Sequence, residues 1–355
     1  MSAGKLKGER VSLKMIADML GTSECTVSKA LHNKPKVSAA MRQKVLELAE
    51  RLNYRPNIIA RSMVGSPLKA AVIYPEVWPS YYENIIRGVF ERAHELQDFR
   101  VEVHPLHYKD FSDCNGCIRA IKRADVEQYD AVILMTGTFL PEDREPLSDC
   151  LQRISCPVLL LGGGMIPDVS VLCHVRQNSF LCGQVAANLA VQLMQGSGSP
   201  AVIIGSRELE DHEMKSAGFV RFLQHSGISC AGVGESFDEY EGAYRAADEL
   251  FRKTPDISLL YVGTENIAGI LALLEDRKLA GKVKVIATGE SLPVREALKT
   301  GKVHFTLDEN LNQQGRTAMD KLFQRLLQSQ NVEKQIMVNP SIKEMCSLLI
   351  PEQFS

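Results

Sequence analysis

Three side chains near the start of the chain have the chemistry to contact the edges of DNA bases. Glu24 and Cys25 are adjacent, and Lys29 follows about one helical turn later. A carboxylate accepts a hydrogen bond from the N4 amine of cytosine, an ammonium donates to O6 or N7 of guanine, and a thiol can contact the methyl group of thymine. The alternative for Glu24 is that its charge only complements the positive end of a helix.

Two short helices joined by a tight turn would position these side chains. Apolar residues recur on one face of each helix. They are Ile16, Met19 and Leu20 in the first helix and Val27, Ala30 and Leu31 in the second. Gly21 can end the first helix because glycine tolerates a positive φ, and Thr22 or Ser23 can cap the second by accepting hydrogen bonds from its free N–H groups. This pattern predicts a helix-turn-helix, the arrangement in which a second helix reads the major groove.

Hydroxyl side chains near the starts of these helices suit phosphate contacts or helix caps. They are Ser12, Ser23, Thr26 and Ser28. A third helix is expected from about residue 39 to residue 52, with Ser38 as its cap. A further helix over about residues 57–64 would follow Pro56, and it is too short to be stable alone in water.

The charge of the chain is distributed unevenly. The net charge is −2, yet residues 1–69 hold 13 Lys and Arg against 5 Asp and Glu, whereas the remainder holds 28 against 38. A small basic domain on an acidic body is expected of a protein that binds nucleic acid through that domain alone. A basic, solvated tail is the alternative, but the charges lie on a patterned helical segment.

From residue 70 onward, short apolar strands alternate with amphipathic helices. This alternation predicts parallel sheets built from βαβ units, hence an α/β body behind an all-α head. The expected strands are 70–74, 100–104, 131–135, 158–161, 201–204, 228–233, 259–262 and 283–288. The expected helices are 82–96, 114–124, 144–153, 179–195, 213–225, 240–253, 267–277, 292–300 and 312–328.

Polar and aromatic side chains follow several of these strands, and parallel sheets bind ligands at the carboxyl ends of their strands. The candidate effector-binding residues are Glu76, Trp78, Tyr81, Tyr82, Thr136, Lys215, Thr264, Glu290 and Glu309. Aromatic faces suit the apolar faces of sugar rings. The alternative for the aromatic residues is that they pack a lobe surface or a dimer interface.

Other classes of protein find little support in the sequence. No apolar run is long enough to span a membrane, and no apolar segment follows the basic N-terminus, so we expect neither a membrane anchor nor a secretory signal. The odd number of cysteines, nine, favours reduced thiols in the cytoplasm. Cys114 and Cys117 have no second pair for zinc, and the glycines at 162–164 open no phosphate-binding helix. We expect no metal, no cofactor and no enzymatic activity.

With these motifs in order, the chain resembles the LacI/GalR family of transcriptional regulators. The motifs of the head are Thr26-Val27-Ser28-Lys29, Val37-Ser38, Leu52-Asn53-Tyr54-Arg55-Pro56-Asn57 and Ala60-Arg61-Ser62-Met63. A looser match in the body rests on Arg87-Gly88, Gly183, Gly218-Phe219, Gly289-Glu290 and Gly315. The resemblance implies a helix-turn-helix DNA-binding domain (1–56), a hinge helix and linker (57–67), and a two-lobed, periplasmic-binding-protein-like domain for effector binding and dimerisation (68–355).

The resemblance also implies roles for individual residues. Glu24, Cys25 and Lys29 match base-contacting positions, and Asn57 and Arg61 match positions that reach the minor groove or phosphates. Met63 stands where a leucine usually wedges a base step; methionine is apolar and can do the same. In the body, Lys215, Thr264 and Glu290 stand where family members place Arg, Asn and Asp to grip sugar hydroxyls.

These implications predict a homodimer that binds a pseudo-palindromic operator and responds to a sugar, a polyol or a sugar derivative. We expect a repressor in which the effector changes the angle between the lobes and thereby the operator affinity. The alternative is a sugar-binding module whose DNA-binding head does not function. Selection of binding sites from random DNA distinguishes the two.

Overall fold

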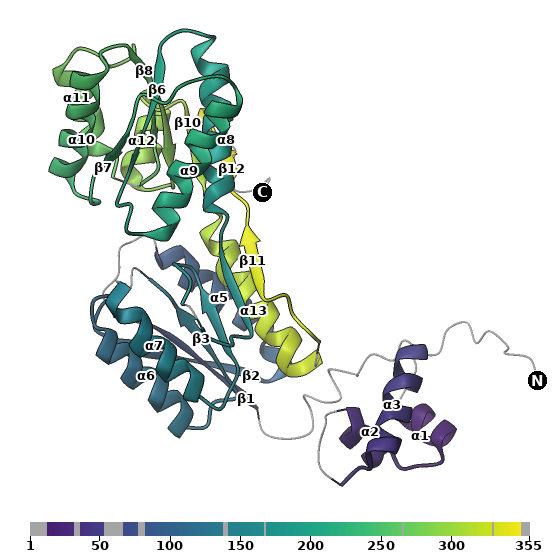
Figure 1. Cartoon of the computed structure of the whole chain (residues 1–355). Coiled ribbons are helices and arrows are strands. Elements are labelled where there is room, and N and C mark those ends of the chain that lie inside the picture. The colour runs from purple at the N-terminus through teal and green to yellow at the C-terminus, as the bar shows by residue number, and fades with distance from the viewer. Residues whose placement is uncertain are drawn as a thin grey trace, which may run out of the picture.

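The structure is a computed structural model that describes residues 13–31, 36–52, 67–76, 82–137, 141–166, 168–264, 266–328 and 330–348. Within these ranges the chain forms a helical head and two α/β lobes (Figure 1). The head consists of α1 (Leu13–Leu20), α2 (Glu24–Leu31) and α3 (Ala39–Arg51). Its core is its own, because the buried side chains of the three helices pack against one another.

The first lobe is a parallel sheet of strands in the order β11-β5-β4-β3-β1-β2. The strands are β1 (Leu68–Pro75), β2 (Val101–Tyr108), β3 (Ala131–Met135), β4 (Val158–Leu161), β5 (Cys173–Gln177) and β11 (Gln335–Val338). One face is covered by α5 (Glu83–Glu95) and α13 (Leu311–Gln328), and the other by α6 (Cys114–Val126) and α7 (Pro141–Arg153). A 3-10 turn, η2 (Gln97–Phe99), leads into β2.

The second lobe repeats this three-layer plan with the strand order β12-β10-β9-β8-β6-β7. Its strands are β6 (Ser199–Ile204), β7 (Val233–Glu235), β8 (Ile257–Val262), β9 (Lys284–Thr288), β10 (Phe305–Asp308) and β12 (Ser341–Lys343), of which β12 is antiparallel to β10. One face carries α10 (Tyr240–Lys253), α11 (Ala268–Asp276) and α12 (Leu292–Lys299), and the other carries α8 (Ser179–Met194) and α9 (Glu210–His225). The 3-10 turn η3 (Met345–Leu348) follows β12.

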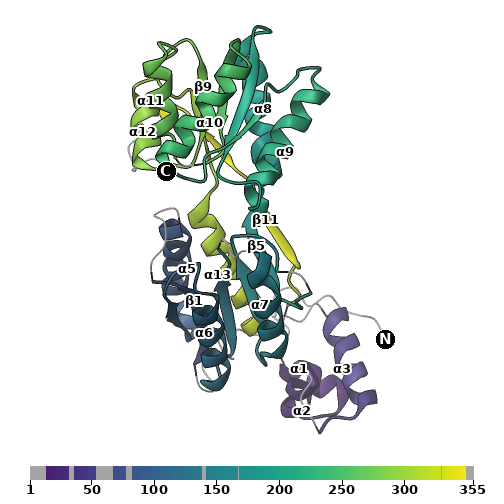
Figure 2. The same cartoon turned by 60° about the vertical axis from the view of Figure 1, so that its left-hand side comes forward.

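The chain crosses between the lobes three times, from β5 to α8, from β10 to α13 and from β11 to β12, as the turned view in Figure 2 also shows. One asparagine lies in each crossing. The Asn178 Nδ2 donates to the Asn339 Oδ1 over 2.9 Å, and the Asn310 Nδ2 donates to the Asn339 carbonyl over 2.8 Å. Since these bonds join all three crossings, the crossings form one connected hinge.

Glycines allow two pairs of helices to pack closely. A Cβ at Gly183 of α8 would lie 2.0 Å from the carbonyl oxygen of Lys215, and a Cβ at Gly218 of α9 would lie 2.1 Å from that of Phe180. No side chain fits at such distances, so these glycines hold α9 against α8. Helices α5 and α13 pack in the same way through Gly88 and Gly315.

The predicted fold class is confirmed, with corrections in detail. Strands β5, β10, β11 and β12 were not among the expected strands. In β5, His174, Arg176 and Gln177 are buried polar residues that interrupt the apolar pattern of a central strand. Helix α9 begins three residues before the expected start, and β7 is confined to Val233–Glu235, at the end of the expected strand. In the part of the chain that the structure describes, no helix has the length and apolar character needed to cross a membrane.

Candidate DNA-binding surface and ligand cavity

The second helix of the helix-turn-helix presents the expected base-contacting side chains. Glu24 and Cys25 open α2 and are exposed, and Lys29 is partly buried in its last turn. The opposite face of α2 is fixed in the core, where Val27 is fully buried and Ala30 is nearly so. The side chains that could contact bases therefore lie on the face of α2 that is not packed against the other helices of the head.

Two hydroxyl residues of the expected DNA-binding set have a structural role in this turn. The Ser23 Oγ accepts a hydrogen bond from the Thr26 backbone N–H over 3.1 Å, and the two hydroxyl oxygens lie 2.9 Å apart. Ser23 therefore caps α2, as Gly21, with a φ of 63°, ends α1. Ser28 lies partly buried on α2. Ser12, Asn57, Arg61 and Met63 lie outside the described residues.

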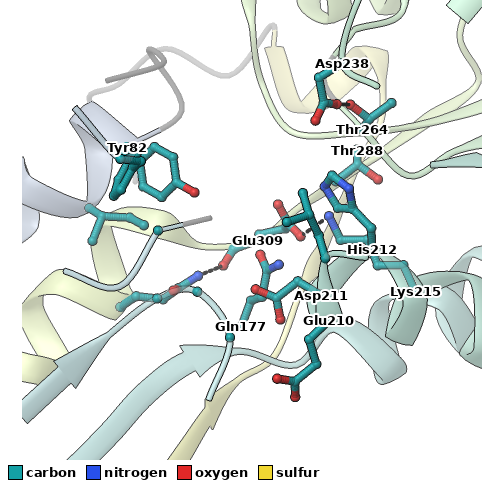
Figure 3. A pocket seen from close by; sticks show the side chains of 18 of the residues that line it. Tyr82, Gln177, Glu210, Asp211, His212, Lys215, Asp238, Thr264, Thr288 and Glu309 are labelled. Carbon is teal, nitrogen blue, oxygen red and sulfur yellow. Dashed lines mark hydrogen bonds and ion pairs between the residues drawn. The ribbon is translucent and has the colours of Figure 1, made fainter. Parts of the chain in front are cut away.

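A cavity of about 500 Å³ lies between the lobes. Its wall comes from both lobes and from the hinge, and Figure 3 shows Tyr82 on one side with Lys215, His212 and Thr288 on the other. The glycines at 162–164, which follow β4, also line it. A cavity of this size and position fits a small ligand that contacts both lobes at once.

Aromatic and apolar side chains form the wall from the first lobe. The rings of Tyr82 and Phe111 lie 4.8 Å apart, and Ile85, Met165 and Ile166 extend this surface. Burial, followed by the charges of nearby carboxylates, raises the pKa of the Tyr82 hydroxyl, so this group stays protonated. The wall can pack against the apolar face of a ring while the tyrosine keeps a hydroxyl for hydrogen bonding.

The second lobe contributes a buried ion pair. The Lys215 Nζ lies 2.7 Å from the Glu309 Oε1, and both side chains are at most 4% exposed. The same ammonium donates to the carbonyl of Gly263 over 3.2 Å. Burial is the largest single effect and lowers the pKa of Lys215. The charge and hydrogen bond of Glu309, together with the nearby Cys182 and Asp211, raise the pKa overall. Because Lys215 comes from α9 and Glu309 from the hinge, the pair joins the second lobe to a crossing segment.

A second ion-pair cluster joins the two lobes directly. Arg176, at the end of β5, is 3% exposed and pairs with Asp211 and, over 2.8 Å, with Glu210, both in the first turn of α9. Glu210 also accepts from the Met165 N–H of the first lobe over 3.0 Å, and Asp211 accepts from the Ser179 hydroxyl over 3.1 Å. The two carboxylates line the cavity, whereas Arg176 lies behind them.

His212 adds a neutral imidazole to the cavity wall. Its Nδ1 accepts from the Ser206 N–H over 3.1 Å, which places the ring proton on Nε2 in the neutral form. Burial, followed by the nearby charge of Lys215, lowers the pKa of His212 to about 4. At neutral pH this residue therefore offers a hydrogen-bond donor without a charge.

A polar group at the ends of β7 and β8 completes the second-lobe wall. Asp238 accepts a hydrogen bond from the Thr264 hydroxyl, and its backbone carbonyl accepts from the Asn266 Nδ2 over 2.9 Å. Thr288, at the end of β9, donates to the Tyr261 hydroxyl over 3.3 Å, and its oxygen can still accept. These groups can bind the hydroxyls of a polyol.

The structure brings together only part of the expected effector-binding set. Tyr82, Lys215, Thr264 and Glu309 line the cavity. Thr136 is buried beside it and donates to the carbonyl of Gly162, so it holds the glycine loop instead of facing the cavity. Trp78 and Tyr81 lie outside the described residues. Two members of the set lie elsewhere, Glu76 at a separate groove beside β2 and Glu290 in an ion pair with Lys343 over 3.3 Å.

Several lining residues were absent from the expected set. They are Phe111, Arg144, Gln177, Glu210, Asp211, His212, Asp238, Asn266 and Thr288. Gln177 ends β5, a strand that the apolar pattern does not predict. The expected start of α9 left Glu210 and Asp211 in a loop. The one available signal was the polar residue that follows each strand, and it points to Asp238 and Asn266.

Two family models match the chain. The model of the lacI family of bacterial regulatory proteins matches residues 12–57, and the model of the periplasmic binding protein domain matches residues 151–330. Catabolite control protein A of Priestia megaterium is 25% identical over 276 residues, which are 76% of this chain and 79% of that protein. The HTH-type transcriptional regulator GalS of Salmonella typhimurium is 23% identical over 291 residues, 80% of this chain and 81% of that protein.

Solved structures agree on the fold of the two lobes. GanP, a glucose-galactose binding protein from Geobacillus stearothermophilus, superposes with a TM-score of 0.68 at 17% identity, covering 81% of this chain and 100% of that one. The periplasmic binding protein model spans more than half of this chain. The chain therefore belongs to the periplasmic binding protein domain family, and it carries the DNA-binding domain of the lacI family of bacterial regulatory proteins.

Proposed function

We propose that this protein is a cytoplasmic transcriptional repressor that binds a pseudo-palindromic operator as a homodimer and responds to a sugar or related polyol. The observation that carries the proposal is the combination of an exposed base-reading helix with a cavity shared between two hinged lobes. Neither the helix nor the cavity alone indicates a regulator. Together they allow a ligand that changes the distance between the lobes to change the operator affinity of the head.

The head supports a dimer. One recognition helix reads only one half-site, and helix-turn-helix proteins reach useful affinity by placing two such helices one turn of DNA apart. Glu24, Cys25 and Lys29 would contact bases, and the hydroxyls of the head together with Asn57 and Arg61 would contact the backbone or the minor groove. Met63 would act as the wedge of the hinge helix.

The cavity supports a polyol ligand. It joins an aromatic wall at Tyr82 and Phe111 to a polar wall of carboxylates, an imidazole, two threonine hydroxyls and side-chain amides, which suits a molecule with one apolar face and many hydroxyls. GanP is a glucose-galactose binding protein, and we propose that a hexose of this kind is also a candidate ligand for this chain. Glu290, which pairs with Lys343, would act on the ligand only indirectly.

Two experiments on the full chain test the proposal. Selection from random DNA should return a sequence with two related half-sites in inverted orientation. Thermal unfolding in the presence of pentoses and hexoses should then identify a stabilising ligand, since a ligand at 100 times its Kd adds about 2.7 kcal/mol. Absence of any selected DNA sequence would favour the alternative, a sugar-binding module with a non-functional head. A selected operator without any stabilising sugar would refute the sugar assignment.

A further inference from the structure

We infer that the interlobe cavity takes an uncharged polyol and rejects the phosphorylated and carboxylated derivatives of the same sugar. The inference deepens the proposed function and rests on it, because it names the charge class of the ligand for that cavity. It follows from the ion pairs and hydrogen bonds already present in the wall. The residues that decide it are Arg176, Glu210 and Asp211.

The buried cations at the cavity are already neutralised. Lys215 pairs with Glu309 at 2.7 Å, and Arg176 pairs with both Glu210 and Asp211. A phosphate or carboxylate that approached either cation would lie close to a carboxylate that the cation already binds. Displacing Glu309 would leave a buried carboxylate without a counter-charge, which is strongly unfavourable, and at Arg176 the anion would meet the carboxylates of both Glu210 and Asp211.

The helix end that could bind an anion is also occupied. Leu209, Glu210, Asp211 and His212, at the start of α9, line the cavity, and free N–H groups at a helix start ordinarily favour an anion. Here the first turn of α9 carries three acidic side chains, those of Glu210, Asp211 and Glu213. The field at this end of the helix is therefore already compensated by the protein.

The remaining polar groups suit hydroxyls. Asp238 has one oxygen engaged by Thr264, so its other oxygen can accept from a ligand hydroxyl. His212 offers a donor without a charge. Each hydroxyl of a polyol both donates and accepts, so these two groups can be satisfied by neighbouring hydroxyls without any net charge on the ligand.

One lining cation stands apart from this arrangement. Arg144 of α7 is partly buried and forms no ion pair with any residue in the described part of the chain. Four carboxylates, those of Glu210, Asp211, Asp238 and Glu309, line the same cavity. Three cations stand against these four carboxylates, namely Lys215, the adjoining Arg176 and Arg144. The balance of charge around a ligand therefore stays acidic even with Arg144 counted.

The test compares matched ligands on the full chain. Each neutral pentose or hexose is paired with its own phosphate monoester and with its sugar acid, and binding is measured by thermal unfolding and calorimetry. The neutral sugar should bind at least about tenfold more tightly than either charged derivative, because the charged forms meet like charges in the wall. The preference should weaken as ionic strength rises, but only in part, since Arg176, Lys215 and Glu309 are shielded from solvent.

A charge-removing variant sharpens the test. Asp211→Asn keeps the Oδ1 that accepts from Arg176 and Ser179 and replaces only the second oxygen, so the fold should be retained. The preference for the neutral sugar over its phosphate should fall by about tenfold, because one repulsive charge has been removed. Glu210→Gln should act in the same direction. Glu208→Gln is the matched control, because Glu208 is exposed in the loop just before α9 and does not line the cavity.

Each outcome decides between defined alternatives. A phosphorylated or acidic sugar that binds the wild-type chain more tightly than its neutral parent, and loses this advantage in Arg144→Gln, would overturn the inference while the regulator proposal stands. If no sugar of any charge binds, both the inference and the sugar assignment fail. An unchanged preference in both Asp211→Asn and Glu210→Gln would show that these carboxylates do not set the selectivity.

Discussion

The head and the interlobe cavity obtain their functional residues in opposite ways. In the head, Glu24, Cys25 and Lys29 come from one eight-residue helix, α2. None of them belongs to the core that α1, α2 and α3 form together. In the cavity, Lys215 and Glu309 come from distant parts of the chain and meet only because α9 and the hinge are packed beside each other. The functional residues of the head can be predicted from one short segment of sequence, whereas those of the cavity come together only in the folded chain.

This difference has an energetic side. Of the side chains proposed to contact DNA, Glu24 and Cys25 are exposed and Lys29 is only partly buried, so all three cost the fold little. In the cavity, the side chains of Arg176, Lys215 and Glu309 are almost fully buried, and removing the partner of such a charge is strongly destabilising. We therefore expect substitutions of these three residues to act on both stability and ligand binding, and substitutions on the outer face of α2 to act on DNA binding alone.

The largest effect should come from breaking the Lys215–Glu309 pair. Lys215→Met leaves a buried carboxylate without its partner, so the free energy of unfolding should fall by about 3–5 kcal/mol. Chemical denaturation of the full chain measures the change. The double variant Lys215→Met with Glu309→Gln removes both charges and should recover at least half of the loss. If the two single effects simply add, the pair is not coupled.

A smaller effect on stability, confined to the head, should follow from Ile16→Ala. Ile16 is fully buried in a core with few members, so the head should lose about 2–4 kcal/mol and with it most of its DNA binding. Unfolding of the lobes should be unchanged. Met19→Ala is the control, because Met19 lies on the same helix and is 54% exposed. A shift of the lobe transition in Ile16→Ala would contradict the separation of the two regions.

A change on the exposed face of α2 should leave stability nearly untouched. Lys29→Ala should weaken binding to the selected operator by about 1–3 kcal/mol and non-specific binding by much less, because a base contact is lost. Fluorescence anisotropy with both kinds of DNA measures the difference. Lys44→Ala, at an exposed position on α3, should weaken both kinds of binding equally. If Lys29→Ala weakened operator binding and non-specific binding equally, Lys29 would not be a base-contacting residue.

The smallest effect concerns pH. The pKa of His212 is about 4 in the folded chain, below its ordinary value of about 6.5, so the unfolded chain binds a proton first as the pH falls. The stability that the neutral imidazole provides is present above about pH 6.5 and is lost as the pH falls, by about 1–2 kcal/mol between pH 6.5 and pH 5. His212→Asn should flatten this slope, whereas His225→Asn, at an exposed position on the same helix, should not. If the stability of His212→Asn changed with pH as steeply as that of the wild-type chain, His212 would not be the group responsible.

Local pattern was sufficient to predict the head and most of the lobes. Helix α10 begins and ends where the apolar period predicts, and strands β3 and β4 match their expected ranges. The apolar pattern did not predict strands in which polar residues are buried. Strand β5 contains a buried arginine whose charge is balanced by α9, and nothing in the sequence of β5 itself indicates that partner.

The cavity was predictable only in part, for the same reason. Lys215 and Thr264 could be proposed because they stand in positions matched to the family, and Glu309 because it lies on the last expected crossover between the lobes. The Lys215–Glu309 pair, and the cluster of Arg176 with Glu210 and Asp211, depend on how α9 lies beside the hinge and the end of β5. That arrangement is visible only in the folded chain.

We propose that ligand binding in the cavity is coupled to DNA binding by the head. The affinity of the full chain for its selected operator, measured with and without the sugar that stabilises it against heat, tests this coupling. We expect a change of at least about fivefold, which is the lower end of ordinary allosteric coupling. A sugar that binds the cavity and leaves the operator affinity unchanged would contradict it.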